Sequence, residues 1–152
     1  MPIDIRPVQR TDAAAWLAMR EQLGAEWVIP GFEKDIERFF ETGLIDNLPH
    51  AVFVAQDGED LVGLAEVSLR QYAEGCETSP VGFLEGWFVE ASHRGRGIGR
   101  ALVDTGVRWA KSNGCTEFAS DAETHNKGSQ AAHESIGFER VCEVVCYRRP
   151  IT

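Results

Sequence analysis

The chain has 152 residues, of which 43% are hydrophobic and 26% are charged, and its net charge is −9 at pH 7. These values are ordinary for a globular protein, and the length suits one domain, which we expect to span residues 1–152. Because nucleic-acid binders tend to be basic, the negative charge argues against a nucleic-acid partner and favours small cationic partners or simply solubility. The longest apolar runs have only a few residues, so we expect no membrane association through a span. The N-terminus lacks the apolar stretch of a signal peptide, and we therefore expect a cytoplasmic protein.

Hydrophobic periodicity, turn residues and capping residues divide the chain into alternating strands and helices. The expected elements are a strand at 3–8, a helix from a cap at Thr11 or Asp12 to about Leu23, a helix at 32–43, strands at 51–56 and 61–70 joined by the turn 57–60, a loop at 71–82, a strand at 83–91, a helix at 101–114, a strand at 115–121, a helix at 126–137 and a strand at 138–149. This order, β-α-α-β-β-β-α-β-α-β, predicts a mixed α/β sheet in one layered domain.

The cysteines predict neither a metal site nor a disulfide framework. Cys76, Cys115, Cys142 and Cys146 show no CxxC spacing, and no histidine cluster accompanies them. Zinc sites use such paired ligands, and disulfide frameworks belong mainly to small secreted chains. We therefore expect no metal cofactor.

Charge is unevenly distributed around one glycine-rich stretch, HRGRGIGR at residues 93–100. Residues 93–111 carry five basic residues against one acidic residue, whereas residues 71–90 carry four glutamates and no lysine or arginine. The stretch lies between an expected strand and the start of a helix, where unpaired N–H groups and the helix dipole favour an anion. Alternating glycines let these N–H groups approach a ligand closely. The pattern therefore predicts an anion site.

Two common phosphate motifs do not fit this stretch. A Walker loop, GxxxxGK[ST], needs a lysine that is absent, and a GxGxxG dinucleotide motif would need a glycine where Arg100 stands. A surface loop that merely carries arginines is the remaining alternative. What fits is R-x-x-G-x-G, formed by Arg94, Gly97 and Gly99. This pattern resembles the pyrophosphate motif of the GNAT acetyltransferase superfamily, as does the order of the preceding strand FLEGWFV and the later segment NKGSQAAHESIGF.

The resemblance implies a GNAT-like single domain, with a mixed central β-sheet flanked by helices, that uses acetyl-CoA as co-substrate. It implies that backbone groups of Trp87, Phe88 and Val89 hold the acetyl carbonyl and the pantetheine arm. The pyrophosphate would be surrounded by Arg94, Gly95, Arg96, Gly97, Ile98, Gly99 and Arg100. The second motif would complete the coenzyme site with Asn126 and His133.

His133 departs from the family pattern. GNAT enzymes often carry a tyrosine at this place, four residues before the glycine of Gly-Phe, which is thought to protonate the leaving thiolate. A histidine can carry a proton near neutral pH and serve as this acid. The alternative is a helix histidine that only packs on the coenzyme.

A closer resemblance, to aminoglycoside 6′-N-acetyltransferases, rests on QYAEGCETSPVGFLEGWFV, GCTEFASD, QAAHESIGFE and the terminal VVCYRR. It implies acetyl transfer to the 6′-amine of an aminoglycoside, hence antibiotic resistance, and, because similar enzymes are often dimers, a homodimer. Two alternatives remain open: an acetyltransferase for another cationic amine, such as a polyamine or a protein N-terminus, and a non-catalytic sensor of acyl-CoA.

An aminoglycoside is a polycation, and the sequence offers carboxylates for it. Glu85 stands inside an apolar strand and Asp121 ends the next, and a charge so placed is costly unless it is paired or functional. Tyr72 and Glu77 lie in the acidic loop, and Trp27 is either an aromatic wall for a sugar or a core residue. We expect Glu85 or Asp121 to take the proton of the acceptor amine, backbone N–H groups of residues 87–89 to stabilise the oxyanion, and no covalent enzyme intermediate.

Overall fold

The computed structural model describes residues 2–23 and 31–152. The chain divides into two compact units, and the boundary along the sequence falls between Asp121 and Ala122. The first contains β1 (Asp4–Pro7), α1 (Ala13–Leu23), α2 (Phe32–Thr42), β2 (Leu44–Ile45), β3 (Leu48–Asp57), β4 (Asp60–Arg70), β5 (Val81–Val89), α3 (Ile98–Ser112) and β6 (Phe118–Ser120), with short 3-10 turns at Arg10–Asp12 and Ala91–His93. The second contains α4 (Lys127–Ser135) and the C-terminal segment. That residues 1–152 act as one domain stays a prediction.

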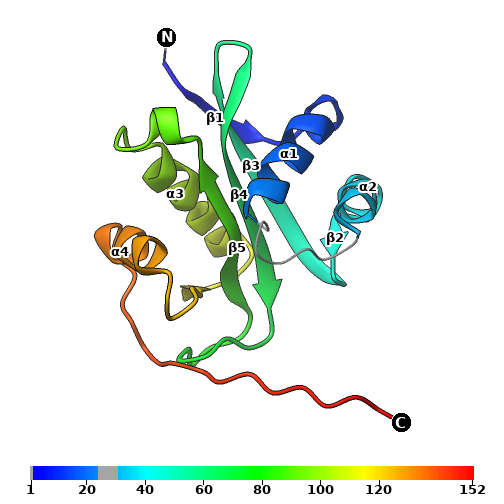
Figure 1. The fold of residues 1–152 in the computed structure, drawn as a ribbon, viewed down its shortest axis with the longest axis vertical. Helices are drawn as coiled ribbons and strands as arrows, with labels where there is room; N and C mark the ends of the chain where they lie inside the picture. The colour runs from blue at the N-terminus through cyan, green and yellow to red at the C-terminus, as the bar shows by residue number, and fades with distance from the viewer. Residues whose placement is uncertain (1, 24–30) are drawn as a thin grey trace. The chain divides into compact units, whose positions relative to one another are not determined.

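The first unit is built on a mixed sheet of strand order β1-β3-β4-β5-β6, with β2 paired to the outer part of β3 (Figure 1). All neighbours are antiparallel except β5 and β6, which run parallel. The expected hairpin at 51–56 and 61–70 is confirmed, and both of its strands are longer than predicted.

Helices cover both faces of this sheet, with α3 on one side and α1 and α2 on the other (Figure 1). A strand presents successive side chains to opposite faces of the sheet, and two neighbouring residues of β4 show this. Gly63 lies against Leu102 of α3, whereas Leu64 belongs to the buried cluster of Trp16 and Ile36 from α1 and α2. No helix of the described residues is both long and apolar enough to cross a lipid bilayer.

Two buried carboxylates connect α1 and the turn before it to the sheet of this unit. Asp12, just before α1, accepts hydrogen bonds from both terminal nitrogens of Arg6 in β1, at 2.7 and 3.0 Å. Glu66 of β4 accepts from Trp16 Nε1 at 3.0 Å and from Arg20 Nε at 2.9 Å. Because each carboxylate faces an arginine, its burial leaves no charge uncompensated.

One expected element is absent. In the part of the chain that the structure describes, residues 138–149 form no strand, and residues 139–152 are exposed. Their β-branched and aromatic residues favour an extended backbone, but a strand also needs a neighbour that supplies hydrogen bonds. Within the described residues no strand pairs with this segment, so the prediction is wrong for the single chain.

Candidate active site

The glycine-rich stretch turns sharply into α3. Gly95 and Gly97 have φ angles of 78° and 81°, in the left-handed region that favours glycine, and Gly97 is the N-cap of α3. The helix therefore begins at Ile98, three residues earlier than the expected range 101–114. Its first N–H groups have no partner within the helix, as at every α-helix N-terminus. Backbone N–H groups and arginines thus meet at one helix end, as the sequence predicts for an anion site.

Gly99 has a different role from the other two glycines. It lies inside the first turn of α3, against the indole of Trp87 in β5, and a Cβ atom there would be 3.0 Å from Trp87 Cζ2. The indole Nε1 donates to the carbonyl oxygen of Gly99 at 3.1 Å. Trp87, expected to contact the coenzyme through its backbone, therefore uses its side chain to fix the helix start on the strand.

One edge of β5 is paired with β6 over only part of its length. β6 pairs with β5 at Gly82, Phe83 and Leu84, and within the described residues the pairing ends there. On the other edge β4 accompanies β5 to Val89. The segment of β5 that carries Trp87, Phe88 and Val89 therefore lies beyond its pairing with β6, and strand edges are where extended ligands can add to a sheet. The carbonyl of Val89 already accepts from Arg94 Nε at 3.0 Å.

Glu85 occupies a β-bulge. Leu84 pairs with Val67 and Gly86 with Glu66, so that Glu85 is the extra residue of β5 at this point. Bulges bend a strand and redirect side chains, and they are frequent next to active sites.

The Glu85 carboxylate is held by residues that sequence analysis did not single out. It accepts from Arg70 Nε at 2.8 Å, from Arg70 Nη2 at 2.7 Å and from Ser68 Oγ at 2.6 Å. The Arg70 guanidinium also stacks on the ring of Phe83, 3.6 Å from its centroid. The sequence does contain a signal for these partners. Ser68 and Arg70 are polar residues at alternate positions at the end of β4, so they share a face of the sheet. A glutamate in an apolar strand needs such partners.

Asp121 is an exposed residue just after β6. The hydrogen bonds that Arg70 donates to Glu85 raise the pKa of Arg70 above its usual value, and the negative charge of Asp121 raises it further. Arg70 is thus held by contact with one candidate proton acceptor, Glu85, and feels the charge of the other, Asp121.

The expected loop residues lie in an exposed segment. Tyr72 donates from its hydroxyl to Glu74 at 3.0 Å. The backbone N–H of Glu77 donates to the carboxylate of Glu117 at 2.9 Å, so Glu117, rather than Glu77, fixes this loop. Hydrogen bonds from Thr78 and Glu77 lower the pKa of Glu117. Trp27 lies outside the described residues.

The second unit contains the two remaining coenzyme candidates. The side chain of Asn126 caps α4 by accepting from the N–H of Ser129 at 3.0 Å. His133 Nδ1 lies 2.7 Å from the carbonyl oxygen of Ser129, and its ring packs edge-on against Phe138. Because a carbonyl only accepts, Nδ1 of His133 carries the proton in this contact.

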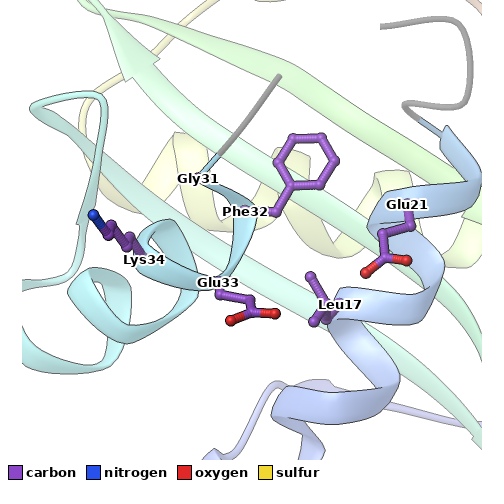
Figure 2. Close-up of a pocket in the computed structure, with 6 residues that line it drawn as sticks. All are labelled: Leu17, Glu21, Gly31, Phe32, Glu33 and Lys34. Carbon is purple, nitrogen blue, oxygen red and sulfur yellow. The ribbon is translucent and has the colours of Figure 1, made fainter. Parts of the chain in front are cut away.

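A pocket of about 330 Å³ lies between α1 and α2, away from the bulge. Figure 2 shows Leu17 and Glu21 of α1 facing the start of α2, where Phe32 and Glu33 stand, while Lys34 points away. Across residues 2–23 and 31–152, no group of three or more His, Cys, Asp or Glu side chains is arranged to hold a metal ion.

This arrangement, a glycine-rich turn into α3 beside the end of β5, has relatives of known identity. A model of the acetyltransferase (GNAT) family matches residues 16–138. The chain belongs to this family. The GNAT fold predicted from the glycine motif is therefore confirmed, including its mixed sheet flanked by helices.

Relatives cover this GNAT chain along nearly its full length. Aminoglycoside N(6′)-acetyltransferase type 1 of Klebsiella aerogenes is 43% identical over 147 residues, which are 97% of this chain and 96% of that protein. The protein of the same name from Stenotrophomonas maltophilia is 41% identical over 150 residues, which are 97% and 93% of the two chains. The structure of AAC(6′)-Iy in complex with the bisubstrate analogue CoA-S-monomethyl-acetylneamine has a TM-score of 0.88 at 36% identity, and the match covers 99% of this chain and 100% of that one.

Proposed function

We propose that this GNAT chain transfers the acetyl group of acetyl-CoA to the 6′-amino group of aminoglycosides and so confers resistance to them. One observation carries the proposal: the chain matches AAC(6′)-Iy, bound to a bisubstrate analogue of CoA and acetylneamine, over 99% of its length with a TM-score of 0.88. The names of the relatives at 43% and 41% identity agree with it.

The geometry of the donor site fits a coenzyme pyrophosphate. The left-handed Gly95 and Gly97 carry no side chain, and an added Cβ at either would meet nothing within 4 Å, so the backbone around the start of α3 is open to a ligand. The amides of Ile98, Gly99 and Arg100 and the guanidinium groups of Arg94 and Arg96 would bind the phosphates. Acetyl-CoA supplies an acetyl thioester, and the edge of β5 from Trp87 to Val89 would hold the acyl end.

In the acceptor site the two carboxylates take different roles. A carboxylate has about four lone-pair positions, and Arg70 and Ser68 use three of those of Glu85. Glu85 can therefore accept one further hydrogen bond, from an ammonium group of the substrate, in a fixed direction. Asp121 is exposed and is our candidate for the proton acceptor, directly or through water. Tyr72, Glu77 and Trp27 complete the proposed acceptor site.

The reaction needs the acceptor amine as a free base, and loss of its proton two pH units below its pKa costs about 2.7 kcal/mol. With the proton on Asp121, the amine nitrogen attacks the acetyl carbonyl carbon. Backbone N–H groups of residues 87–89 stabilise the oxyanion, and the C–S bond then breaks. The departing thiolate takes a proton, for which His133 is the candidate donor. No acyl-enzyme forms in this scheme, so an isolable acetyl-cysteine would contradict it.

A thiol-release assay with acetyl-CoA tests the proposal. Neomycin and paromomycin are a matched pair, since they differ in carrying an amine or a hydroxyl group at the 6′ position. We expect turnover with neomycin and none at the 6′ position of paromomycin, with the product located by mass spectrometry. Turnover of spermidine but of no aminoglycoside would overturn the proposal in favour of another cationic amine. Binding of acetyl-CoA without turnover of any amine would instead indicate a sensor.

We propose further that the chain is a homodimer in which residues 138–149 pair with the sheet of a second copy. The support is exposure: Val144, Val145 and Tyr147 are 54%, 74% and 91% exposed, in a segment whose composition favours a strand. Light scattering of the full chain should give twice the chain mass. Val145→Asp should shift the mass toward the monomer with an unchanged circular dichroism spectrum, whereas Glu143→Gln, which leaves the apolar residues in place, should not. A monomeric full chain at micromolar concentration would contradict the dimer. The cytoplasmic location stays a prediction.

A further inference from the structure

His93, the first residue of the glycine-rich stretch, makes contacts that the proposed reaction does not use. Its Nε2 lies 2.8 Å from Oδ2 of Asp57, at the end of β3, and its Nδ1 lies 2.8 Å from Oγ of Ser92. The side chains of His93 and Asp57 are 18% and 29% exposed, so the pair is largely shielded from water. Sequence analysis gave no role to either residue, and they are 36 positions apart.

The contact connects the turn between β3 and β4 to the start of the glycine-rich stretch. On the stretch side, the N–H of Glu90 donates to the carbonyl of Val62 in β4 at 2.8 Å, and the N–H of His93 donates to the carbonyl of Glu90 at 2.9 Å. Backbone bonds thus hold the chain as far as His93. Arg94 is held as well, by its N–H on the carbonyl of Ala91 at 3.4 Å and its Nε on the carbonyl of Val89 at 3.0 Å. The left-handed Gly95 and Gly97 follow at once, so the His93 side chain is one of the fixed points directly before them.

The pair holds in both protonation states of the imidazole. In neutral His93 the proton on Nε2 is donated to Asp57, and Nδ1 accepts the hydroxyl proton of Ser92. In protonated His93 both nitrogens donate, and Ser92 Oγ accepts. The hydrogen bond from His93 also lowers the pKa of Asp57, so its carboxylate stays charged at neutral pH.

Other charges surround the pair. Asp12, Glu59, Asp60 and Glu90 line a hollow of about 540 Å³ together with His93 and Ser92, and the charge of Arg96 acts on Asp57 as well. All four of these acidic residues repel an anion, as does Asp57. Electrostatics alone therefore disfavours an acidic residue next to a phosphate site, and a structural role accounts better for Asp57.

We propose that Asp57 is a positioning residue for coenzyme binding: through His93 it holds the glycine-rich stretch in the conformation that receives the pyrophosphate. This inference rests on the proposed function. Without the Asp57–His93 contact, residues 94–97 lose the side-chain anchor that precedes them and are less ordered, and CoA has to order them when it binds. Ordering a side chain or a short loop weakens binding by about three- to tenfold.

Three variants distinguish the effect of the Asp57–His93 contact from the effect of the negative charge of Asp57. Asp57→Ala removes the contact and one negative charge. Asp57→Asn removes the charge but keeps an oxygen that accepts from His93 Nε2. Glu59→Ala removes one negative charge from the same turn without touching His93. If Asp57 acts only by its charge, all three variants bind the anionic CoA as tightly as the wild type or more tightly.

The readouts are the Kd for CoA by calorimetry and amide hydrogen exchange of residues 94–99 in the ligand-free protein. We expect Asp57→Ala to raise the Kd about three- to tenfold and to accelerate exchange, with Asp57→Asn and Glu59→Ala within about twofold of the wild type. Steady-state kinetics should show the change in KM for acetyl-CoA and not in kcat.

The wild type provides the first check. If CoA does not protect residues 94–99 from exchange in the wild type, the proposed coenzyme site is wrong, and the positioning role is wrong with it. If CoA protects them but Asp57→Ala binds CoA as tightly as the wild type, only the positioning role is overturned. Equal losses in Asp57→Ala and Asp57→Asn also contradict it, because the retained acceptor oxygen would then have no effect.

Discussion

Arg70 donates hydrogen bonds from Nε and Nη2 to the two carboxylate oxygens of Glu85, at 2.8 and 2.7 Å. The arginine therefore orients Glu85 and at the same time places a positive charge in the site that we propose for a polycation. Arg70→Ala should separate these effects. We expect kcat with an aminoglycoside to fall about tenfold, because the substrate amine is less well aligned. The KM for the aminoglycoside should not rise, because a repelling charge has gone. Arg108→Ala, on the exposed side of α3, serves as the control for removal of a positive charge. A higher KM at unchanged kcat would show that Arg70 instead contributes to binding.

The two carboxylates should respond differently to neutralisation. Asp121→Asn removes the proposed proton acceptor, and we expect kcat to fall about a hundredfold. Glu85→Gln keeps its shape beside Arg70, and its main effect should be a higher KM for the aminoglycoside. Steady-state rates measured between pH 5 and pH 9 give kcat and KM for both variants. The reverse pattern would assign the proton transfer to Glu85.

Gly99 should tolerate a methyl group poorly. In Gly99→Ala the new Cβ would lie 3.0 Å from Trp87 Cζ2, and relief of such overpacking costs about 1–3 kcal/mol of unfolding free energy. Affinity for CoA should fall as well, because the start of α3 shifts. Gly128 also lies in the first turn of a helix, but its nearest neighbour would be 3.9 Å away. Gly128→Ala should therefore be neutral or stabilising, by up to about 1 kcal/mol. Urea titration of both variants measures the difference.

The buried Glu66 should be among the most sensitive positions for stability. Its side chain is 4% exposed, and Glu66→Ala leaves the guanidinium of Arg20 without its main partner. Removing one side of a buried ion pair costs about 3–5 kcal/mol. Asp35 is the second partner of Arg20, at 3.0 Å, and is 32% exposed. Asp35→Ala should cost less than about 1 kcal/mol. Equal losses in the two variants would show that burial does not decide the effect.

Acid should weaken the protein through Asp12. Its hydrogen bonds with Arg6 lower the pKa of Asp12 below its usual value. A group with a lowered folded-state pKa contributes stability above its unfolded pKa of about 3.9, and the contribution is lost as the pH falls through the folded value. Asp12→Asn should therefore reduce the unfolding free energy at pH 7 by about 1.5–3 kcal/mol, and by less at pH 3. Asp104→Asn, at an exposed position of α3, serves as the control for the loss of one carboxylate charge. A constant difference across this range would rule out the proposed linkage.

Local sequence pattern predicts much of this fold, and the features that it misses depend on pairing between distant segments. Alternating residues around the turn 57–60 predict the β3–β4 hairpin because its partners are adjacent in sequence. The alternating glycines predict close approach of the backbone to a ligand, and the structure adds that Gly95 and Gly97 are left-handed. The link between Asp57 and His93 depends instead on where two distant segments meet in the sheet.

The acceptor side shows the same division. An isolated glutamate in an apolar strand indicates a function or a partner, but only the register of β4 against β5 identifies Arg70 as that partner. The apolar residues of 138–149 indicate an extended segment, and they do not say which chain completes it. Composition predicts a preference for the strand conformation, whereas hydrogen bonds with a neighbour decide whether a strand forms.

The bulge at Glu85 makes the length of β5 as important as its composition. Insertion or deletion of a residue elsewhere in β5 would shift its register by one, and such a shift turns the side chains on one side of it to the opposite face of the sheet. Deletion of Glu85 itself would restore regular pairing of Leu84 and Gly86 with β4 and would remove the carboxylate that Arg70 holds. Related chains that retain this site should therefore vary in sequence along β5 more readily than in residue count. Insertions and deletions should collect in the neighbouring loop at 71–80, which lies outside the strands.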